Sequence, residues 1–135
     1  MNKVFADSVY WIALINPRDQ WRKAALETSR KLTDCTIYTT DEVLVETLNH
    51  FAEAGSHFRQ LVSREIEQIL LAREIFILDA THDNFLNGLE MFRNRPDKGY
   101  SVTDCISMLA MREHRIINVL THDDHFTQEG FTTLL

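Results

Sequence analysis

Four acidic residues, placed in four separate segments of a 135-residue chain, are the side chains best suited to do chemistry together. They are Asp7, Glu46, Asp104 and Asp123. Two carboxylates about 4 Å apart repel by about 4 kcal/mol at an effective dielectric near 20, so a pocket that gathers several of them is partly protonated or binds cations. Oxygen ligands without a thiolate suit Mg²⁺ or Mn²⁺. Metal held in this way typically serves the cleavage of phosphodiester bonds.

The acids can meet only if the elements that carry them end at the same edge of a sheet. Short apolar or β-branched runs predict strands at Lys3–Ala6, Thr36–Thr39, Ile75–Leu78, Ile116–Leu120 and Phe131–Leu134. Helical spacing predicts helices at Ser8–Asn16, Arg18–Leu32, His57–Ala72, His82–Arg95, Ser101–His114 and Asp124–Glu129, with a further helix that contains Glu46 and ends near Gly55. This alternation predicts an α/β fold of three layers, α/β/α, around a parallel sheet.

A parallel sheet brings these acids to one edge, beyond the carboxyl ends of its strands, where ligands bind in such folds. Asp7 and Asp123 directly follow predicted strands, and Asp104 lies in the first turn of a predicted helix. Glu46 lies deeper in its helix, but its longer side chain can reach back toward the edge. The four acids can therefore converge without unusual backbone geometry.

Each acid also has an explanation that involves no chemistry. Asp7 suits the N-cap of the following helix, and Asp104 ends a Ser-Val-Thr-Asp stretch that matches a capping box. Glu46 shares a polar stripe typical of a solvated helix face, and Asp123 could be a turn residue beside Asp124. For any one acid alone these explanations are favoured. The metal site is indicated by all four acids falling at one sheet edge.

Other polar residues compete for a place in this site. The stretch His122-Asp-Asp-His125 matches no helical zinc motif such as HExxH. A surface role, or a contact behind the metal ligands, is therefore favoured for both histidines over direct ligation. Arg93, Arg95 and Lys98 lie in or beside the loop that leads to Asp104 and are the candidates for binding a substrate backbone, although a solvated connector explains them equally well.

Bulk properties set limits on the class of protein. The length is most simply that of one domain, residues 1–135, able to bury one sizeable core. The apolar run Val9–Ile15 is too short to span a bilayer and lacks the flanks of a secretory signal, so a cytoplasmic location is expected. Cys35 and Cys105 lie far apart in apolar surroundings, which favours buried thiols. The net charge of −6 neither supports nor excludes a nucleic-acid partner, because the four candidate acids carry four of these charges.

Four short motifs follow one another over nearly the whole chain. They are a strand that ends in Asp-Ser (Asp7, Ser8), a Thr-rich strand end followed by Glu (Thr39, Thr40, Glu46), a Ser-x-x-Asp-Cys helix start (Ser101, Asp104, Cys105) and a closing Thr-x-Asp-x-His-Phe (Thr121, Asp123, His125, Phe126). Each motif alone is weak, but their order and spacing are fairly specific. In this arrangement the chain resembles the PIN-domain ribonucleases, particularly the VapC-type toxins of prokaryotic toxin–antitoxin pairs.

The resemblance implies both a fold and a function. The fold would be a PIN fold with a five-stranded parallel sheet flanked by helices. The activity would be a metal-dependent endoribonuclease in which the four acids form the catalytic and metal-binding quartet, with Mg²⁺ or Mn²⁺ as the cofactor. Thr121 matches a position that is commonly Thr or Ser beside the site, and Ser8 would support the site through its hydroxyl. The expected partners are an RNA substrate, a second copy in a homodimer and a small antitoxin.

Two other functions are also open at this point. A metal-dependent phosphatase or receiver-like domain places acids after parallel strands, but it usually has paired acids at the first strand and a late Lys. Here Asp7 stands alone and no Lys follows Lys98. A non-enzymatic PIN-like interaction module would keep the fold and act by binding, and the intact quartet argues against it.

Overall fold

The central sheet of the computed structural model, which describes residues 2–135, has five parallel strands within that range. They are β1 (Lys3–Ala6), β2 (Thr36–Thr40), β3 (Ile75–Leu78), β4 (Asn118–Leu120) and β5 (Thr132–Thr133). Their order is β3-β2-β1-β4-β5, so β1 is central. Val4, Phe5 and Ala6 of β1 are fully buried, as expected for a parallel strand covered on both faces.

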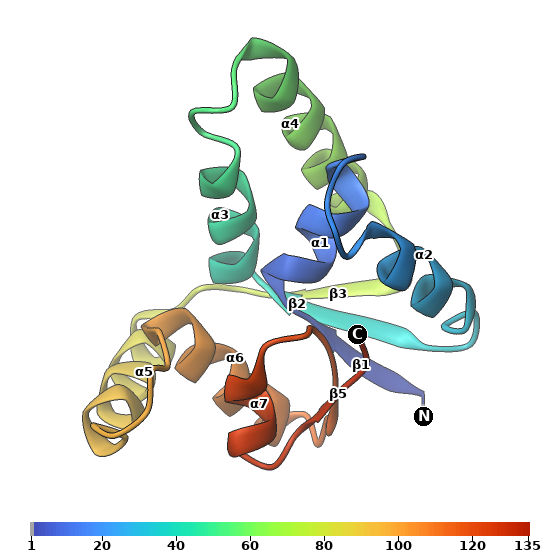
Figure 1. Cartoon of the computed structure of the whole chain (residues 1–135). Coiled ribbons are helices and arrows are strands. Elements are labelled where there is room, and N and C mark those ends of the chain that lie inside the picture. Colours follow the sequence, from blue (N-terminus) through green and yellow to red (C-terminus); the bar gives the residue numbers. More distant parts are fainter. Residues whose placement is uncertain (1) are drawn as a thin grey trace.

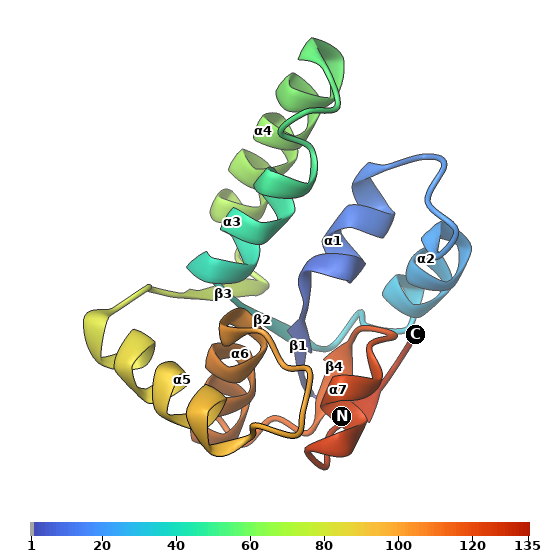
Figure 2. The same ribbon diagram turned by 60° about the vertical axis from the view of Figure 1, so that its left-hand side comes forward.

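Helices cover both faces of this sheet. The described helices are α1 (Ser8–Ile15), α2 (Arg22–Arg30), α3 (Asp41–His50), α4 (Ser56–Leu71), α5 (His82–Asn94), α6 (Val102–Glu113) and α7 (Asp124–Gln128). Figures 1 and 2 show α1 to α4 on one side of the sheet and α5 to α7 on the other. The predicted three-layer α/β/α fold with a parallel sheet is therefore confirmed.

The direction in which the chain adds strands reverses at β1. The chain runs from β1 outward to β2 and β3, and then returns to place β4 and β5 on the other side of β1. The carboxyl ends of β1 and β4 therefore lie side by side, joined by a hydrogen bond from the Asp7 backbone N–H to the Leu120 carbonyl at 3.3 Å. Ligands bind at such a reversal in open α/β sheets.

Several predicted boundaries and burial assignments are wrong. The helix predicted from Arg18 begins at Arg22, because Asp19 forms a turn in which its carboxylate accepts from the Trp21 N–H at 2.8 Å. The last strand is shorter than predicted. Leu70 belongs to the apolar stripe Phe58, Leu61, Val62, Ile66, Ile69 and Leu70, whose spacing predicts one buried helix face, but it is 56% exposed. Cys105 is buried as predicted, whereas Cys35 is only half-buried.

The packing of α5 on α6 depends on a glycine. A Cβ placed on Gly88 would lie 2.5 Å from Cγ1 of Ile106, well inside van der Waals contact. We expect Gly88→Ala to lower the free energy of unfolding by about 1–2 kcal/mol, because overpacking costs about 1–3 kcal/mol and the gain in helix propensity offsets about 0.5–1 kcal/mol. Urea unfolding measures this. Asn87→Ala, on an exposed neighbouring position of the same helix, is the matched control and should not destabilise; equal stability of the two variants would contradict this packing.

Candidate active site

Asp7 lies at the carboxyl end of β1 and is the most deeply buried of the four acids, with 3% of its surface exposed. It occupies the N-cap position of α1, but its side chain makes no capping hydrogen bond. One carboxylate oxygen, Oδ2, accepts from the Thr121 hydroxyl at 3.0 Å. The other, Oδ1, is buried and has no hydrogen-bond partner among the described residues. A helix cap therefore does not explain the position of this carboxylate.

The surroundings of Asp7 disfavour the ionised form of its carboxyl group. Burial, together with the negative charges of Asp104 and Glu46, raises the pKa of Asp7 to about 7, against the lowering effects of the Ser8 backbone N–H and the Thr121 hydroxyl. A carboxyl group held in this way is neutralised near pH 7 either by a proton or by a cation.

The carboxyl end of β4 contributes Thr121 and Asp123. The Thr121 hydroxyl donates to Asp7 and accepts from the Asp123 backbone N–H at 3.1 Å, so one side chain ties the ends of β1 and β4 together. Asp123 is the N-cap of α7, and its Oδ1 accepts from the His125 backbone N–H at 2.9 Å. Its neighbour Asp124 is exposed. This placement favours Asp123 over Asp124 as the site residue.

Asp104 serves its helix and faces the site at the same time. It completes a capping box: the Ser101 N–H donates to Asp104 Oδ2 at 3.0 Å, and the Asp104 N–H donates to the Ser101 hydroxyl at 2.9 Å. The capping role predicted for this stretch is confirmed. The same oxygen, Oδ2, lies 3.3 Å from Nδ1 of His125. Asp104 is 8% exposed.

His125 lies closer to the acids than the sequence indicated. Its Nδ1 is 3.3 Å from both Asp104 Oδ2 and Asp123 Oδ1. One ligand atom from each of these three residues lies within 4.8 Å of the others, which is close enough for them to share one metal ion. The spacing Asp-x-His could have indicated this, since an N-cap acid whose oxygen accepts from the N–H two residues later brings that residue's side chain close.

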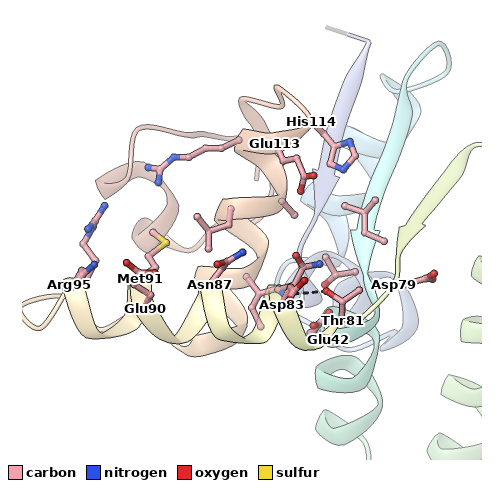
Figure 3. Close-up of a pocket in the computed structure, with 18 residues that line it drawn as sticks. Glu42, Asp79, Thr81, Asp83, Asn87, Glu90, Met91, Arg95, Glu113 and His114 are labelled. Carbon is pink, nitrogen blue, oxygen red and sulfur yellow. Dashed lines mark hydrogen bonds between the residues drawn. The ribbon is translucent and has the colours of Figure 1, made fainter.

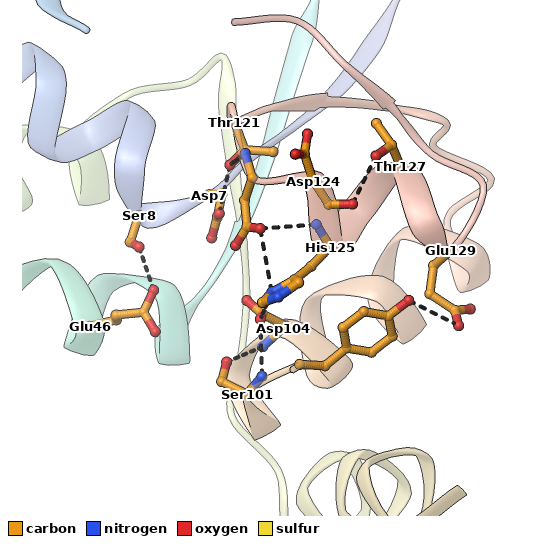
Figure 4. A network of polar contacts seen from close by, with 12 residues as sticks. Asp7, Ser8, Glu46, Ser101, Asp104, Thr121, Asp124, His125, Thr127 and Glu129 are labelled. Atoms are coloured by element: carbon orange, nitrogen blue, oxygen red, sulfur yellow. Dashed lines mark hydrogen bonds and ion pairs between the residues drawn. The ribbon is translucent and has the colours of Figure 1, made fainter. Parts of the chain in front are cut away.

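Glu46 lies on the other side of Asp7. It is half-buried in α3 and accepts a hydrogen bond from the Ser8 hydroxyl, as Figure 4 shows. Its charge raises the pKa of Asp7, so it lies close enough to act on the buried carboxyl. The four acids therefore come together as predicted, in two parts: Asp104 and Asp123 with His125, and Glu46 with Ser8, on either side of Asp7.

Comparison with known proteins agrees with this architecture. A model of the PIN domain family matches residues 4–131. The chain belongs to the PIN domain family. The match begins within β1, spans β2, β3 and β4 and ends just before β5, and it covers all four acids of this PIN domain. A search of curated proteins found no match.

Solved structures share the fold at low sequence identity. VapC20 of Mycobacterium tuberculosis, described as a sarcin–ricin loop cleaving toxin, aligns with a TM-score of 0.85 and 22% identity, covering 96% of each chain. FitAcB from Neisseria gonorrhoeae aligns with a TM-score of 0.70 and 14% identity, covering 98% of this chain and 96% of the other. At these identities the likeness concerns the fold.

The three basic residues predicted to bind substrate differ in their surroundings. Arg93 is exposed at the end of α5. Lys98 is exposed and lies 3.6 Å from the neighbouring carboxylate of Asp97. Arg95 is held by Glu129, with its Nε 2.6 Å from Glu129 Oε1. Arg95 thus differs from Lys98 in that its carboxylate partner comes from a distant part of the chain.

A cleft of about 810 Å³ in the PIN domain lies away from the acids. Figure 3 shows it beside α5 and α6. Carboxylates line much of it, from Glu42, Asp79, Asp83, Glu90 and Glu113, and its two arginines are Arg95 and Arg112. Both arginines are bound to Glu129. None of the four acids lines this cleft, whereas the buried oxygen of Asp7 that has no hydrogen-bond partner among the described residues lies at the edge of the sheet.

Proposed function

We propose that this PIN domain is a metal-dependent endoribonuclease that hydrolyses RNA phosphodiester bonds, and that it is the toxin of a toxin–antitoxin pair. The observation that carries the proposal is the buried Asp7 carboxylate with one oxygen unpartnered, next to Asp104 and Glu46 at the reversal of strand order. Such a group is costly to bury without a counter-charge. A divalent cation supplies that charge.

The residues present fit Mg²⁺ or Mn²⁺. Asp7, Asp104 and Asp123 offer carboxylate oxygens, Glu46 lies beside them, and the described site contains no thiolate. Hard, oxygen-rich sites of this kind suit these two ions. His125 would serve as a further ligand or as a hydrogen-bonding group behind Asp104 and Asp123. When bound, the ion would polarise a phosphate oxygen and lower the pKa of a water molecule at the site.

Other side chains of the protein orient the carboxylates of the site. The Thr121 hydroxyl fixes one oxygen of Asp7 and leaves the other facing the site. The Ser8 hydroxyl holds one oxygen of Glu46, so the second can orient a water molecule or bind a second ion. Asp104 lies in the first turn of α6, where the positive end of the helix dipole favours a phosphate. Arg93 and Lys98 would hold the flanking backbone of the RNA, with Arg95 in a weaker position.

The partners follow from the same proposal. VapC20 is described as cleaving the sarcin–ricin loop, and an RNA that contains this loop is a reasonable first substrate for this chain as well. A small antitoxin would hold the enzyme inactive, and the site of action would be the cytoplasm. Among the described residues no helix is both long and apolar enough to cross a membrane.

A homodimer is also proposed, on the family resemblance. Trp11 is buried in the core, and Phe58 is half-buried and stacks on Phe51. Helix α5 instead exposes four large apolar side chains: Phe85, Leu86, Leu89 and Phe92. Sedimentation equilibrium would measure the oligomeric state.

The proposal is tested by incubating the purified protein with a mixed RNA pool that includes a hairpin carrying the sarcin–ricin loop. Cleavage is expected with Mn²⁺ or Mg²⁺ and is expected to stop when a chelator is added. Binding of metal without any cleavage across the pool would favour the interaction module over the nuclease. Turnover of phosphate monoesters without RNA cleavage would favour a phosphatase.

Metal binding has its own signature in stability. A ligand at about 100 times its dissociation constant adds about 2.7 kcal/mol to the folded state. We therefore expect millimolar Mn²⁺ to raise the melting temperature by roughly 10 °C for a domain of this size, and Asp104→Asn to lose most of that shift. Differential scanning fluorimetry measures it. An unchanged melting temperature of the wild type would count against the metal site whatever the RNA assay shows.

A further inference from the structure

Glu129, directly after α7, is the meeting point of three side chains that come from elsewhere in the chain. Its Oε1 accepts from Arg95 Nε at 2.6 Å and from the Tyr100 hydroxyl at 3.4 Å. Its Oε2 accepts from the guanidinium of Arg112 in α6 and from a second nitrogen of Arg95, the latter at 3.4 Å. We call Glu129, Arg95, Arg112 and Tyr100 the Glu129 cluster.

The cluster is partly buried and strongly ionic. The Glu129 side chain is 9% exposed. Its hydrogen bond with Arg95, and then that with Arg112, lower the pKa of Glu129 to about 2, against the effect of burial. Charge-assisted hydrogen bonds of this kind are stronger and more directional than neutral ones. The cluster therefore fixes the loop from Arg95 to Tyr100 against α6 and the end of α7.

The end of that loop rests on His125. The Tyr100 ring meets the His125 ring edge to face, with centroids 5.4 Å apart and an interplanar angle of 61°. Gly99 lies against the other ring nitrogen: a Cβ at this position would be 3.1 Å from His125 Nε2. The opposite side of the ring presents Nδ1, 3.3 Å from each of Asp104 Oδ2 and Asp123 Oδ1. The imidazole thus lies between the loop and the two carboxylates, with 31% of the His125 side chain exposed.

We propose that Glu129 is a positioning residue for the active site: by holding Arg95, Arg112 and Tyr100 it fixes Gly99 and Tyr100 against His125, and so places the imidazole between Asp104 and Asp123. The proposal deepens the nuclease function and rests on it for its kinetic consequences. It also gives Arg95 a different role from the predicted one. Two nitrogens of its guanidinium donate to Glu129, so Arg95 holds the loop in place instead of binding RNA.

Two variants test this arrangement: one changes the contacts of Glu129, and the other changes the contact between Gly99 and His125. Glu129→Gln keeps the shape of the side chain and removes the charge that holds the two arginines. Gly99→Ala leaves the Glu129 cluster untouched and inserts a methyl group against the His125 ring. Glu90→Gln, an exposed carboxylate on α5, is the matched control. Gly99→Ala also keeps the test valid if Glu129→Gln fails to fold.

The expected kinetic result is a loss of kcat with little change in KM. A misplacement of about 1 Å at a reacting centre can cost about 100-fold, so we expect each variant to lose roughly tenfold or more in kcat at saturating Mn²⁺. KM for RNA should change by less than about threefold, a split that indicates loss of interactions made in the transition state. A lower KM in Glu129→Gln with unchanged kcat would overturn the proposal, because it would show a released Arg95 binding RNA.

The imidazole itself provides a readout that needs no activity. In ¹⁵N-edited spectra of the metal-free protein, the His125 ring signals are expected to shift in both variants and to stay unchanged in Glu90→Gln. Unshifted His125 signals in a folded Gly99→Ala protein would overturn the proposal. If the wild type cleaves no RNA, the proposed function fails, and the spectra still decide whether Glu129 positions His125.

Discussion

Replacing Asp104 by Asn is expected to reduce metal-dependent RNA cleavage by about 100-fold or more. The side chain of Asn is nearly the same size and can still accept from the Ser101 N–H, so the capping box of α6 should survive. What is lost is the negative charge that faces His125 and Asp123. Removing a single preorganised electrostatic group from an active site typically costs about 100- to 1000-fold in kcat.

The measurement is the single-turnover rate of RNA cleavage at saturating Mn²⁺. Asp124→Asn is the matched control, because Asp124 is exposed at the start of α7 and adjacent to Asp123. It should retain nearly all activity. Similar rates for the wild type and Asp104→Asn, with both proteins folded, would remove Asp104 from the mechanism.

Replacing Asp7 by Asn is expected to abolish cleavage and yet stabilise the metal-free protein above pH 7. The folded-state pKa of Asp7, about 7, is raised above the ordinary value of 3.8. The stability that the protonated carboxyl contributes is therefore complete below about pH 4 and is lost as the pH rises through about 7. Each unit of pKa difference corresponds to about 1.4 kcal/mol. The Asn side chain carries no charge and avoids this loss.

The net gain at pH 8 is expected to be about 1–3 kcal/mol. It is smaller than the full electrostatic difference, because the amide of Asn would leave a buried donor unpaired, at a cost of about 1–3 kcal/mol. Urea unfolding in chelator at pH 5 and pH 8 measures the effect. The stability difference between Asp7→Asn and the wild type should be larger at pH 8, whereas Asp79→Asn, an exposed acid after β3, should show the same difference at both pH values. If Asp7→Asn were less stable than the wild type at pH 8, the raised pKa of Asp7 would be contradicted.

The sequence is a good guide to the sheet edge because its signals are local. A buried strand followed at once by Asp7, and another followed by Thr121 and Asp123, place those residues wherever the strands end. Parallel topology then brings the ends together. The fold class, the assembly of the four acids and the PIN family were predictable for this reason. The choice of Asp123 over Asp124 also followed from the motif, since Asp123 is the residue tied to Thr121.

The remaining features depend on contacts between distant residues. Arg95 and Glu129 are 34 positions apart, and no local pattern indicates that they pair. From the sequence, Arg95 is therefore a candidate for binding substrate, whereas in the structure its guanidinium is bound by Glu129. The position of His125 depends on the same loop, because Gly99 and Tyr100 fix one side of its ring. Such arrangements require the fold before they can be recognised.

The acids of this site also have structural duties. Asp104 closes the capping box of α6, and Asp123 caps α7. Asp7 is different, since it is buried without a capping bond and carries an unpartnered oxygen. Capping residues typically stabilise a helix by about 1 kcal/mol, which partly offsets the repulsion among the carboxylates. Asp104 and Asp123 are therefore helix caps in the structure, and this capping role is compatible with the proposed metal binding.

The most direct test of the central claim is the chemistry of the RNA ends. If the carboxylates hold a divalent ion that activates water for in-line attack on phosphorus, with the 3′ oxygen as the leaving group, the fragments should carry 5′-phosphate and 3′-hydroxyl ends. They should form in Mn²⁺ and not in chelator, and they should be absent with Asp7→Asn. Fragments with 2′,3′-cyclic phosphates would show attack by the RNA's own 2′-hydroxyl, and equal cleavage in chelator would show that no metal is needed. Either result would contradict the account.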